Sequence, residues 1–170
     1  MNFILRPWKL SDAESLTLYA NNKKIADNLR NTFPQPYTLE DAKWFITNAT
    51  EKNGTTQLSY AIDVDGVAVG SISVARKDDV AKKSAELGYW LGEPYWGNGI
   101  MPRAVGQICS EAFERFDLVR IYSEVFAYNK ASQRTLEKAG FALEGVLRKS
   151  IYKNGKIYDS YIFAKIKPGV

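Results

Sequence analysis

The stretch from Ala85 to Ala112 reads AELGYWLGEPYWGNGIMPRAVGQICSEA, and it decides the fold. Its first part, ELGYWL at 86–91, has the aromatic and aliphatic residues of a mostly buried strand. Pro102 suits the first turn of a following helix, because the first N–H groups of a helix have no internal partner. Gly97 and Gly99 leave backbone amides uncovered just before that helix, where the helix dipole adds positive potential. The stretch therefore predicts a strand, a turn that binds an anion, and a helix.

The helix is expected to pack one apolar face against the sheet, because apolar residues recur at helical spacing. These residues are Ala104, Val105, Ile108, Cys109, Ala112, Phe113 and Phe116. The turn does not match the known phosphate loops. There is no G-x-x-x-x-G-K-[ST] run, and G-x-G-x-x-G fails because position 102 is Pro. A nucleoside triphosphatase is therefore not expected, and a turn that merely starts a helix remains an alternative.

Length and composition favour one globular domain over residues 1–170. Apolar residues make up 45% and charged residues 25% of the chain, which is ordinary for a soluble protein. The single cysteine excludes an internal disulfide, and its place on the apolar helix face favours packing over catalysis. Histidine is absent, which excludes histidine-based triads and most zinc sites, so we expect no metal.

Other partners are constrained by charge and hydropathy. No stretch reaches 18 uninterrupted apolar residues and no signal-peptide pattern opens the chain, so we expect a cytoplasmic protein without membrane contact. The net charge of +4 is spread along the sequence. Direct nucleic-acid binding is not expected, because lysines and arginines form no cluster. A monomer and a homodimer both remain open.

Periodicity and turn residues predict the remaining elements and one compact α/β domain. Besides 86–91, the expected strands are 3–7, 58–64, 67–75, 119–126, 141–152 and 156–167. The other expected helices begin with a capping box at Ser11, occupy 25–29, follow a cap at Thr38, and occupy 130–139. Asp65-Gly66 and Asn154-Gly155 predict hairpin turns, because a type I′ turn needs positive φ at both central positions.

The run GYWLGEPYWGNGIMPRAV resembles the acetyl-coenzyme A loop of the GNAT N-acetyltransferases, whose pattern is Q/R-x-x-G-x-G/A. Residues 94–99 occupy the six positions, with Pro94 in place of the usual Gln or Arg. The W-G-x-G form is similar to the RimJ/RimL-like branch, which includes acetyltransferases of ribosomal-protein N-termini. Further blocks agree in family order over nearly the whole chain: LRP at 5–7, PYTLEDA at 36–42, NKAS at 129–132 and LEKAGF at 136–141.

The resemblance implies the GNAT fold, a single mixed, mostly antiparallel sheet of about six or seven strands with about four or five helices. The sheet is expected to be splayed where acetyl-CoA binds. The implied activity is transfer of the acetyl group of acetyl-CoA to a primary amine by direct attack. A protein N-terminal amine is the first expectation and a small amine the second. A catalytically weak acyl-CoA-binding or sensor module on the same fold is the alternative.

For the coenzyme, the resemblance implies three groups of contacts. The pyrophosphate is expected on the amides of Trp96, Gly97, Asn98, Gly99, Ile100 and Met101. Backbone groups of Tyr89, Trp90 and Leu91 are expected to pair with the pantetheine amides and to supply an oxyanion donor. Asn129 and Ser132 are expected to contact the pantetheine arm.

The expected catalytic residues are Glu86, Ser132 and Tyr128. Glu86 is the candidate general base, acting through a water, because an amine is mostly protonated at neutral pH. Exposure to solvent or an ion pair with Arg120 would instead make Glu86 structural. Ser132, Tyr128 and Tyr122 are the candidate acids for the leaving thiolate. Ser132 equally suits a role at a helix start, and positioning alone can supply much of the rate.

The acceptor pocket is expected between the first helices, the loop at 33–37 and the last hairpin near 152–158. Its candidate residues are Asn28, Arg30, Phe33, Gln35 and Tyr37. Arg30 could receive an acidic group of the acceptor or lie on plain surface. The sequence does not distinguish a protein N-terminus from a polyamine, an amino acid or an aminoglycoside.

Overall fold

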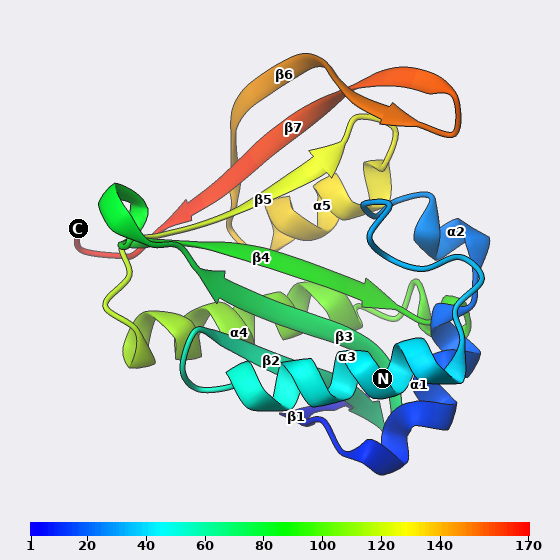
Figure 1. Cartoon of the computed structure of the whole chain (residues 1–170). Helices are drawn as coiled ribbons and strands as arrows, with labels where there is room; N and C mark the ends of the chain where they lie inside the picture. Colours follow the sequence, from blue (N-terminus) through cyan, green and yellow to red (C-terminus); the bar gives the residue numbers. More distant parts are fainter.

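The computed structural model describes residues 1–170 and contains a single seven-stranded sheet in the order β1-β2-β3-β4-β5-β7-β6 (Figure 1). The strands are β1 Ile4–Pro7, β2 Gln57–Val64, β3 Val67–Arg76, β4 Ser84–Leu91, β5 Arg120–Phe126, β6 Ala142–Lys153 and β7 Lys156–Ile166. The α-helices are α1 Ala13–Ala20, α2 Lys23–Ala26, α3 Leu39–Lys52, α4 Ile100–Arg115 and α5 Lys130–Lys138. All neighbouring strands are antiparallel except β4 and β5, which confirms the expected mixed sheet.

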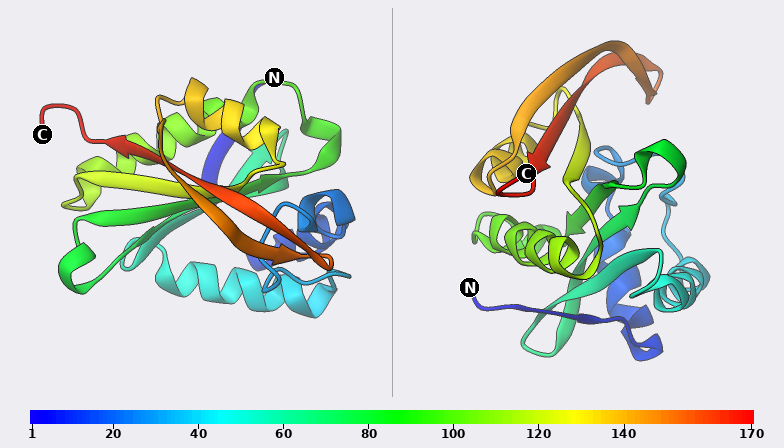
Figure 2. Two further views of the ribbon diagram at one scale, coloured as in Figure 1. Left: turned by 90° about the horizontal axis from the view of Figure 1, so that it is seen from above. Right: turned by 90° about the vertical axis from the view of Figure 1, so that its left-hand side faces the viewer.

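Helices cover both faces of the sheet (Figures 1 and 2). On one face, α4 presents the predicted apolar side to a core cluster of 25 buried residues that includes Ile72, Leu87 and Ile108. On the other face, α1 and α3 pack on a smaller cluster of 10 buried residues, including Leu16, Ile46 and Ala61. The β6–β7 hairpin extends beyond this layered part and curls over the end of β5 (Figure 2).

Both predicted hairpin turns are confirmed. Asp65 and Gly66 join β2 to β3 with φ of 53° and 86°, and Asn154 and Gly155 join β6 to β7 with φ of 52° and 76°. The predicted cap of α3 is also confirmed. The Thr38 hydroxyl accepts the amide of Asp41 at 3.2 Å, while the Asp41 carboxylate accepts the amide of Thr38 at 2.9 Å.

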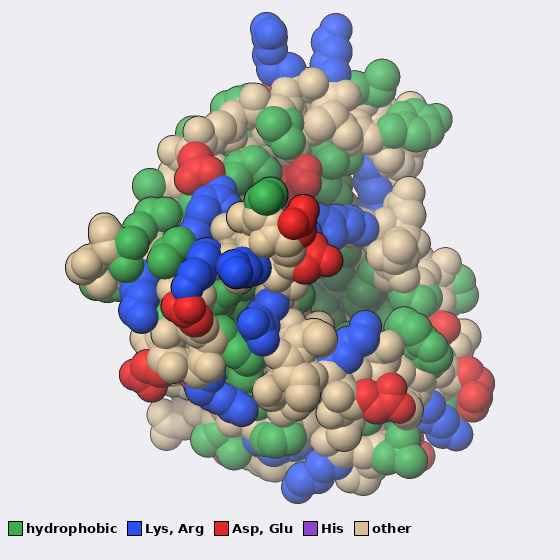
Figure 3. All heavy atoms as spheres, turned by 60° about the vertical axis from the view of Figure 1, so that its left-hand side comes forward, with side chains coloured by type: hydrophobic (Ala, Val, Ile, Leu, Met, Phe, Trp, Pro, Cys, Tyr) green, Lys and Arg blue, Asp and Glu red, His purple; other side chains and the backbone are tan.

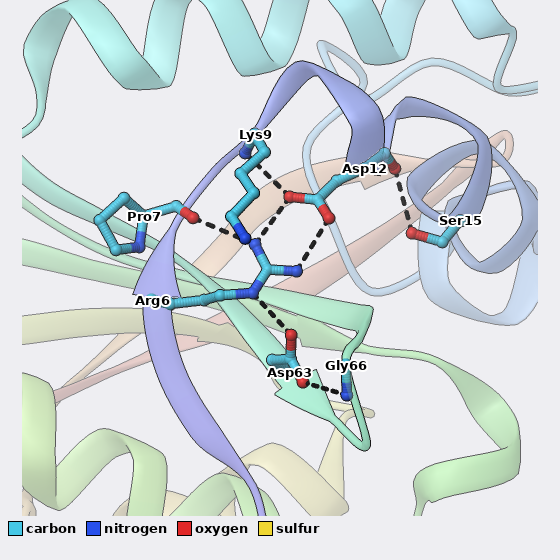
Figure 4. A network of polar contacts seen from close by, with 7 residues as sticks. All are labelled: Arg6, Pro7, Lys9, Asp12, Ser15, Asp63 and Gly66. Atoms are coloured by element: carbon cyan, nitrogen blue, oxygen red, sulfur yellow. Dashed lines mark hydrogen bonds and ion pairs between the residues drawn. The ribbon is translucent and has the colours of Figure 1, made fainter.

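The predicted capping box at Ser11 is wrong. Residues Leu10–Asp12 form a 3₁₀ turn, α1 begins at Ala13, and the Asp12 carboxylate accepts the Lys9 amide at 2.8 Å. Arg6 donates to both oxygens of Asp12 at 2.8 Å and to Asp63 at 2.6 Å, which joins β1, β2 and the start of α1 (Figure 4). A buried ion-pair network therefore sets the start of this helix in place of a serine cap.

Helix α2 also differs from its expected range of 25–29. It begins two residues earlier because the Asn22 side chain accepts the amide of Lys24 at 2.9 Å and caps it. None of the helices is long and apolar enough to span a membrane. On the face drawn in Figure 3, acidic and apolar side chains are interspersed among the lysines and arginines.

Candidate active site

Strands β4 and β5 separate after only three paired positions. Their parallel register runs from Ser84 and Arg120 to Glu86 and Tyr122, and no pairing follows. Beyond this point β4 stays with β3 while β5 continues with β7, so the sheet opens like a fork (Figure 1). The Ser123 hydroxyl donates to the Leu87 carbonyl at 3.1 Å and satisfies the first acceptor that the separation exposes. The expected splay is confirmed.

The backbone of β4 presents hydrogen-bonding groups to this opening. In an antiparallel pair, residues alternate between facing the partner strand and facing away. Lys77 N donates to Ser84 O and Gly92 N donates to Val69 O, so the backbones of Ser84 and Gly92 face β3. By alternation along β4, the backbone groups of Leu87, Tyr89 and Leu91 face away from β3. The indole of Trp96 donates to the Leu91 carbonyl at 2.7 Å. Tyr89 is thus left with its amide and carbonyl turned into the fork.

Trp90 does not fit the backbone role expected for it. By the same alternation its amide and carbonyl face Ser71 of β3. Its side chain instead lies at the groove and packs edge-on against Phe33 at 6.1 Å between ring centroids.

The turn before α4 has the predicted form of an anion site. Gly97 and Gly99 have φ of 75° and 67°, and a Cβ built on either glycine meets nothing within 4 Å. No amide of residues 97–99 donates within the chain, and the Ile100 and Met101 amides belong to the first turn of α4. The Trp96 amide differs from expectation, because it donates to Glu93 O at 3.1 Å. The Asn98 side chain donates to the Tyr95 carbonyl at 3.1 Å and holds the turn closed.

A groove of about 930 Å³ connects this turn to the fork and to the loop after α2. Most predicted site residues line it: Asn28, Arg30, Phe33, Tyr37, Glu86, Tyr89, Trp90, Leu91, Trp96, Gly97, Asn98, Gly99, Ile100, Met101, Asn129 and Ser132. Tyr128 and Gln35 do not line it. The fold thus brings the candidate coenzyme-binding residues and the candidate acceptor-binding residues into one continuous cavity.

Ser132 is held at the groove by a second hydroxyl. The Tyr89 phenol from β4 lies 2.5 Å from the Ser132 hydroxyl on α5. Burial raises the pKa of Tyr89 to about 12, although the hydrogen bond to Ser132 opposes this shift. The phenol therefore keeps its proton at neutral pH. Asn129 caps α5 by accepting the Ser132 amide at 3.2 Å, so the helix-start role considered for Ser132 belongs to Asn129 instead.

Glu86 lies at the branch of the fork, on the face opposite Ser132. Its carboxylate accepts the Arg30 guanidinium at 2.6 Å and the Tyr122 hydroxyl at 3.4 Å. The alternative pairing with Arg120 is not formed, because Arg120 pairs with Glu144 and stacks over Tyr122. Glu86 is therefore neither free in solvent nor paired with its strand neighbour.

Tyr128 is not placed for acid catalysis. Its hydroxyl donates to the Asp27 carbonyl and its ring packs on Phe126 and Tyr158, outside the groove lining. It belongs instead to a set of contacts that join the loop after α2 to the β6–β7 hairpin. Within this set, Lys153 donates to the Leu29 carbonyl at 2.7 Å. Burial and nearby Lys23 lower the pKa of Lys153, against the opposing effect of Asp27.

Aromatic side chains form the wall opposite the hairpin. Phe33 packs on Tyr37 at 5.1 Å between centroids as well as on Trp90. Tyr37 is buried, and burial followed by the charge of Asp41 raises the pKa of its phenol to about 12. This wall can hold an apolar group of an acceptor but supplies no charge.

Three groups at the site were not predicted. They are the Ser123 hydroxyl, the Glu124 carboxylate and the Tyr89 phenol. The alternation of β5 shows that residues 119–126 have two faces, but it does not show which face meets an opening in the sheet. That opening arises from pairing between distant segments, so only the assembled sheet reveals these roles.

Comparison with known protein families supports the resemblance. A family described as "Acetyltransferase (GNAT) domain" matches residues 2–142. The chain is 40% identical over 169 residues to the uncharacterized N-acetyltransferase YoaA of Bacillus subtilis (strain 168), covering 97% of this chain and 93% of that protein. It is 31% identical over 98 residues to the ribosomal-protein-serine acetyltransferase of Escherichia coli (strain K12), covering 58% and 54% of the two chains.

A solved structure agrees with the fold. The chain is similar to the microcin C7 self-immunity acetyltransferase MccE, whose crystal structure is a complex with acetyl-CoA and AMP. The TM-score is 0.84 at 30% sequence identity, with 97% of this chain and 92% of that chain covered.

Proposed function

The chain belongs to the GNAT family and is an N-acetyltransferase, and on that premise we propose that its groove transfers the acetyl group of acetyl-CoA to a protein N-terminal amine. One observation carries the proposal. The β4–β5 fork leaves the Tyr89 amide and carbonyl unpaired beside a glycine turn whose amides are also unpaired. The two sets of backbone donors line one groove, as a coenzyme with a pantetheine arm and a pyrophosphate requires.

The pyrophosphate fits the turn before α4. Amides of Gly97, Asn98 and Gly99 converge there with the positive end of the helix dipole, which favours an anion. A pantetheine N–H then donates to the Tyr89 carbonyl in the fork, which leaves the Tyr89 amide for the thioester oxygen. Asn129 and Ser132, at the start of α5, flank the arm from the other side.

The chemical step is direct attack. The amine nitrogen attacks the thioester carbonyl carbon, and the Tyr89 amide donates to the oxygen on which negative charge develops. Before the attack, Glu86 takes one proton of the ammonium through a water, and the attack by the neutral amine then forms the C–N bond. As the intermediate collapses, the C=O bond is restored, the C–S bond breaks and the nitrogen loses its second proton to water. Ser132 delivers a proton to the leaving thiolate and recovers one from solvent. The protonated Tyr89 phenol orients the Ser132 hydroxyl for this transfer.

A protein N-terminus is the proposed acceptor because the LRP, PYTLEDA, NKAS and LEKAGF blocks resemble the RimJ/RimL-like branch. A relative of 31% identity is named a ribosomal-protein-serine acetyltransferase, which is in keeping with that acceptor. The groove also extends past the fork to the aromatic wall and to the β6–β7 hairpin, which leaves room for more than a small amine.

Thiol release from acetyl-CoA across a panel of amines tests the proposal. The panel contains peptides that begin with Ser, Ala, Thr or Asp, and also spermidine, an aminoglycoside and free amino acids. Release with the peptides supports the proposal, and release confined to a small amine would replace the proposed acceptor. Coenzyme binding measured by calorimetry without any release would favour the sensor alternative.

A further inference from the structure

Two carboxylates from neighbouring strands converge on one arginine inside the groove. The Arg30 Nη2 atom lies 2.6 Å from Glu86 on β4 and 4.0 Å from Glu124 on β5. Both glutamates lie at the branch of the fork, on the face that the acceptor must approach if coenzyme occupies the α4 side. The arginine comes from the loop that follows α2.

The carboxylates are held by the sheet, independently of the arginine. The Ser160 hydroxyl, which is completely buried, donates to Glu124 at 3.0 Å and lies 2.7 Å from the Ser150 hydroxyl. The Tyr122 hydroxyl approaches Glu86 at 3.4 Å. These contacts come from β5, β6 and β7, so removal of the arginine leaves both glutamates supported.

The arginine is the loosely held member of the group. The Arg30 side chain is 63% exposed, against 24% for Glu86 and 23% for Glu124. Its only hydrogen bond is the one to Glu86. An ion pair with such an exposed partner adds little to stability, because water competes for it and a long side chain must be ordered. Another cation can therefore replace the guanidinium at small cost.

The pair of carboxylates attracts a cation to the position that Arg30 occupies. Both carboxylates face this one position, so a positive group there interacts favourably with each of them. Lys153 does not serve this purpose, because its ammonium is bonded to the Leu29 carbonyl and the Asn31 side chain. An acceptor ammonium has the required charge and three donors, and in this position it adjoins the proposed base.

We propose that Glu86 and Glu124 form the subsite for the acceptor ammonium and that the Arg30 guanidinium fills this subsite until an acceptor displaces it. The substrate class follows from the charges. An amine with a carboxylate on the adjacent carbon is repelled by the two glutamates, whereas a peptide N-terminus, in which that carboxylate is an amide, is accepted. This inference rests on the proposed function and specifies the acceptor of the same site.

A matched pair of small acceptors tests the charge requirement. Serinamide and free serine differ at the carboxyl group, and serinamide mimics a peptide N-terminus. The wild-type enzyme is expected to use serinamide with at least about tenfold higher kcat/KM, the effect of one charged contact. Higher kcat/KM with free serine, together with loss of that activity in Arg30→Gln, would overturn the proposal and make Arg30 a carboxylate-binding residue.

Two variants test the residues. Arg30→Gln is expected to lower KM for serinamide several-fold without loss of kcat, because the competing cation is gone. Glu124→Gln is expected to raise KM by about tenfold, since one charged contact with the ammonium is lost. Arg148→Gln and Glu51→Gln make the same charge changes at exposed positions outside the groove lining and serve as controls. An unchanged KM in either test variant would contradict the proposal.

Binding of guanidinium and serinamide tests the proposed ammonium subsite without requiring acetyl transfer. Guanidinium chloride at millimolar concentration is expected to compete with serinamide more strongly in Arg30→Gln than in the wild type, because it refills the vacated subsite. Calorimetric titration measures both ligands in the presence of coenzyme A. Equal affinities in the two proteins would overturn the inference even if acetyl transfer is observed. Tighter binding in the variant without any acetyl transfer would overturn only the proposed function.

Discussion

The phenol of Tyr89 and the hydroxyl of Ser132 lie 2.5 Å apart and join β4 to α5 on the coenzyme side of the fork. Strands β4 and β5 have already separated at this point, and α5 follows β5 in the chain. The bond between Tyr89 and Ser132 therefore links the two halves of the opened sheet on that face. We thus assign Tyr89 two roles. Its backbone is proposed to bind the coenzyme, and its side chain to orient the proposed proton donor.

Removal of the Tyr89 hydroxyl should slow acetyl transfer because Ser132 is then no longer oriented. We expect Tyr89→Phe and Ser132→Ala each to lower kcat by about 100-fold, at the lower end of general acid catalysis. The double variant should be no slower than Ser132→Ala alone, because residues in direct contact are not additive. Initial rates of coenzyme A release measure this cycle. Losses that simply multiply would show that Tyr89 acts independently of the serine.

The glycine turn should be essential for coenzyme binding but not for folding. We expect Gly97→Trp to weaken coenzyme A binding at least about 100-fold, because the indole fills the anion site. The free protein has space for a Cβ there, so the folding cost is the positive φ alone. Gly66→Trp is the matched control, with φ of 86° in the β2–β3 turn and equal open space. Calorimetry and thermal unfolding of both variants separate binding from strain, and normal affinity in Gly97→Trp would place the pyrophosphate elsewhere.

Removal of the proposed base should change how the rate depends on pH. We expect Glu86→Gln to lower kcat/KM about 100-fold near pH 7. The rate of the variant should then rise with pH until the acceptor α-amine, which has a pKa of about 8, is neutral without a base. Glu51→Gln, at an exposed position outside the groove, should keep the wild-type profile. An unaltered profile in Glu86→Gln would make Glu86 a structural residue.

The Arg6 network should govern acid stability. Burial alone would raise the pKa of Asp12, but hydrogen bonds from Arg6 and from the Lys9 amide outweigh it and hold that pKa below its ordinary value. Stabilisation is therefore present above about pH 4, the unfolded value, and is lost as pH falls through the folded pKa. We expect Asp12→Asn to lower the free energy of unfolding by about 3 kcal/mol at pH 7, because Asp63 alone then pairs with the half-buried Arg6.

Denaturant unfolding between pH 3 and pH 7 measures this effect. The Asp12→Asn protein should depend less on pH than the wild type over this range. Asp78→Asn, at an exposed and unpaired position, serves as the control. Equal stability of Asp12→Asn and wild type at pH 7 would show that the network adds nothing to the fold.

The thiol of Cys109 should not react with the reagent that detects released coenzyme A. Cys109 is 1% exposed, and burial raises its pKa to about 12, so the reactive thiolate does not form at neutral pH. We expect a thiol reagent to titrate no thiol in the native protein and one in denaturant. Rapid reaction of the native protein would show that α4 opens readily from the core.

The fold could largely be predicted from the sequence because local patterns coincide with the elements. The 86–91 strand, the glycine turn and the apolar face of α4 are contiguous, and Asp65-Gly66 and Asn154-Gly155 determine their own hairpins. The start of α1 could not be predicted, because Ser11 fits a local cap while Arg6 and Asp63 supply a stronger distant network. A local sequence pattern does not show that a contact between distant residues will replace a local helix cap.

The site was predictable where it depends on backbone and less so where it depends on side chains from distant strands. Gly97 and Gly99 directly indicate the turn proposed as the anion site. Glu124 and Ser160 meet only because β5 pairs with β7, and Arg30 reaches them from a loop 56 residues before Glu86. Tyr128 appeared equivalent to other tyrosines in the sequence, yet its hydroxyl is bonded to Asp27 outside the groove.

The most direct measurement is mass spectrometry of a peptide that begins with serine and contains one internal lysine, after incubation with the enzyme and acetyl-CoA. We expect one added acetyl group on the N-terminal amine, and none when that amine is blocked or when Gly97→Trp replaces the wild type. An acetyl group on the lysine, or an unmodified peptide despite bound coenzyme, would contradict the proposed transfer to the N-terminal amine.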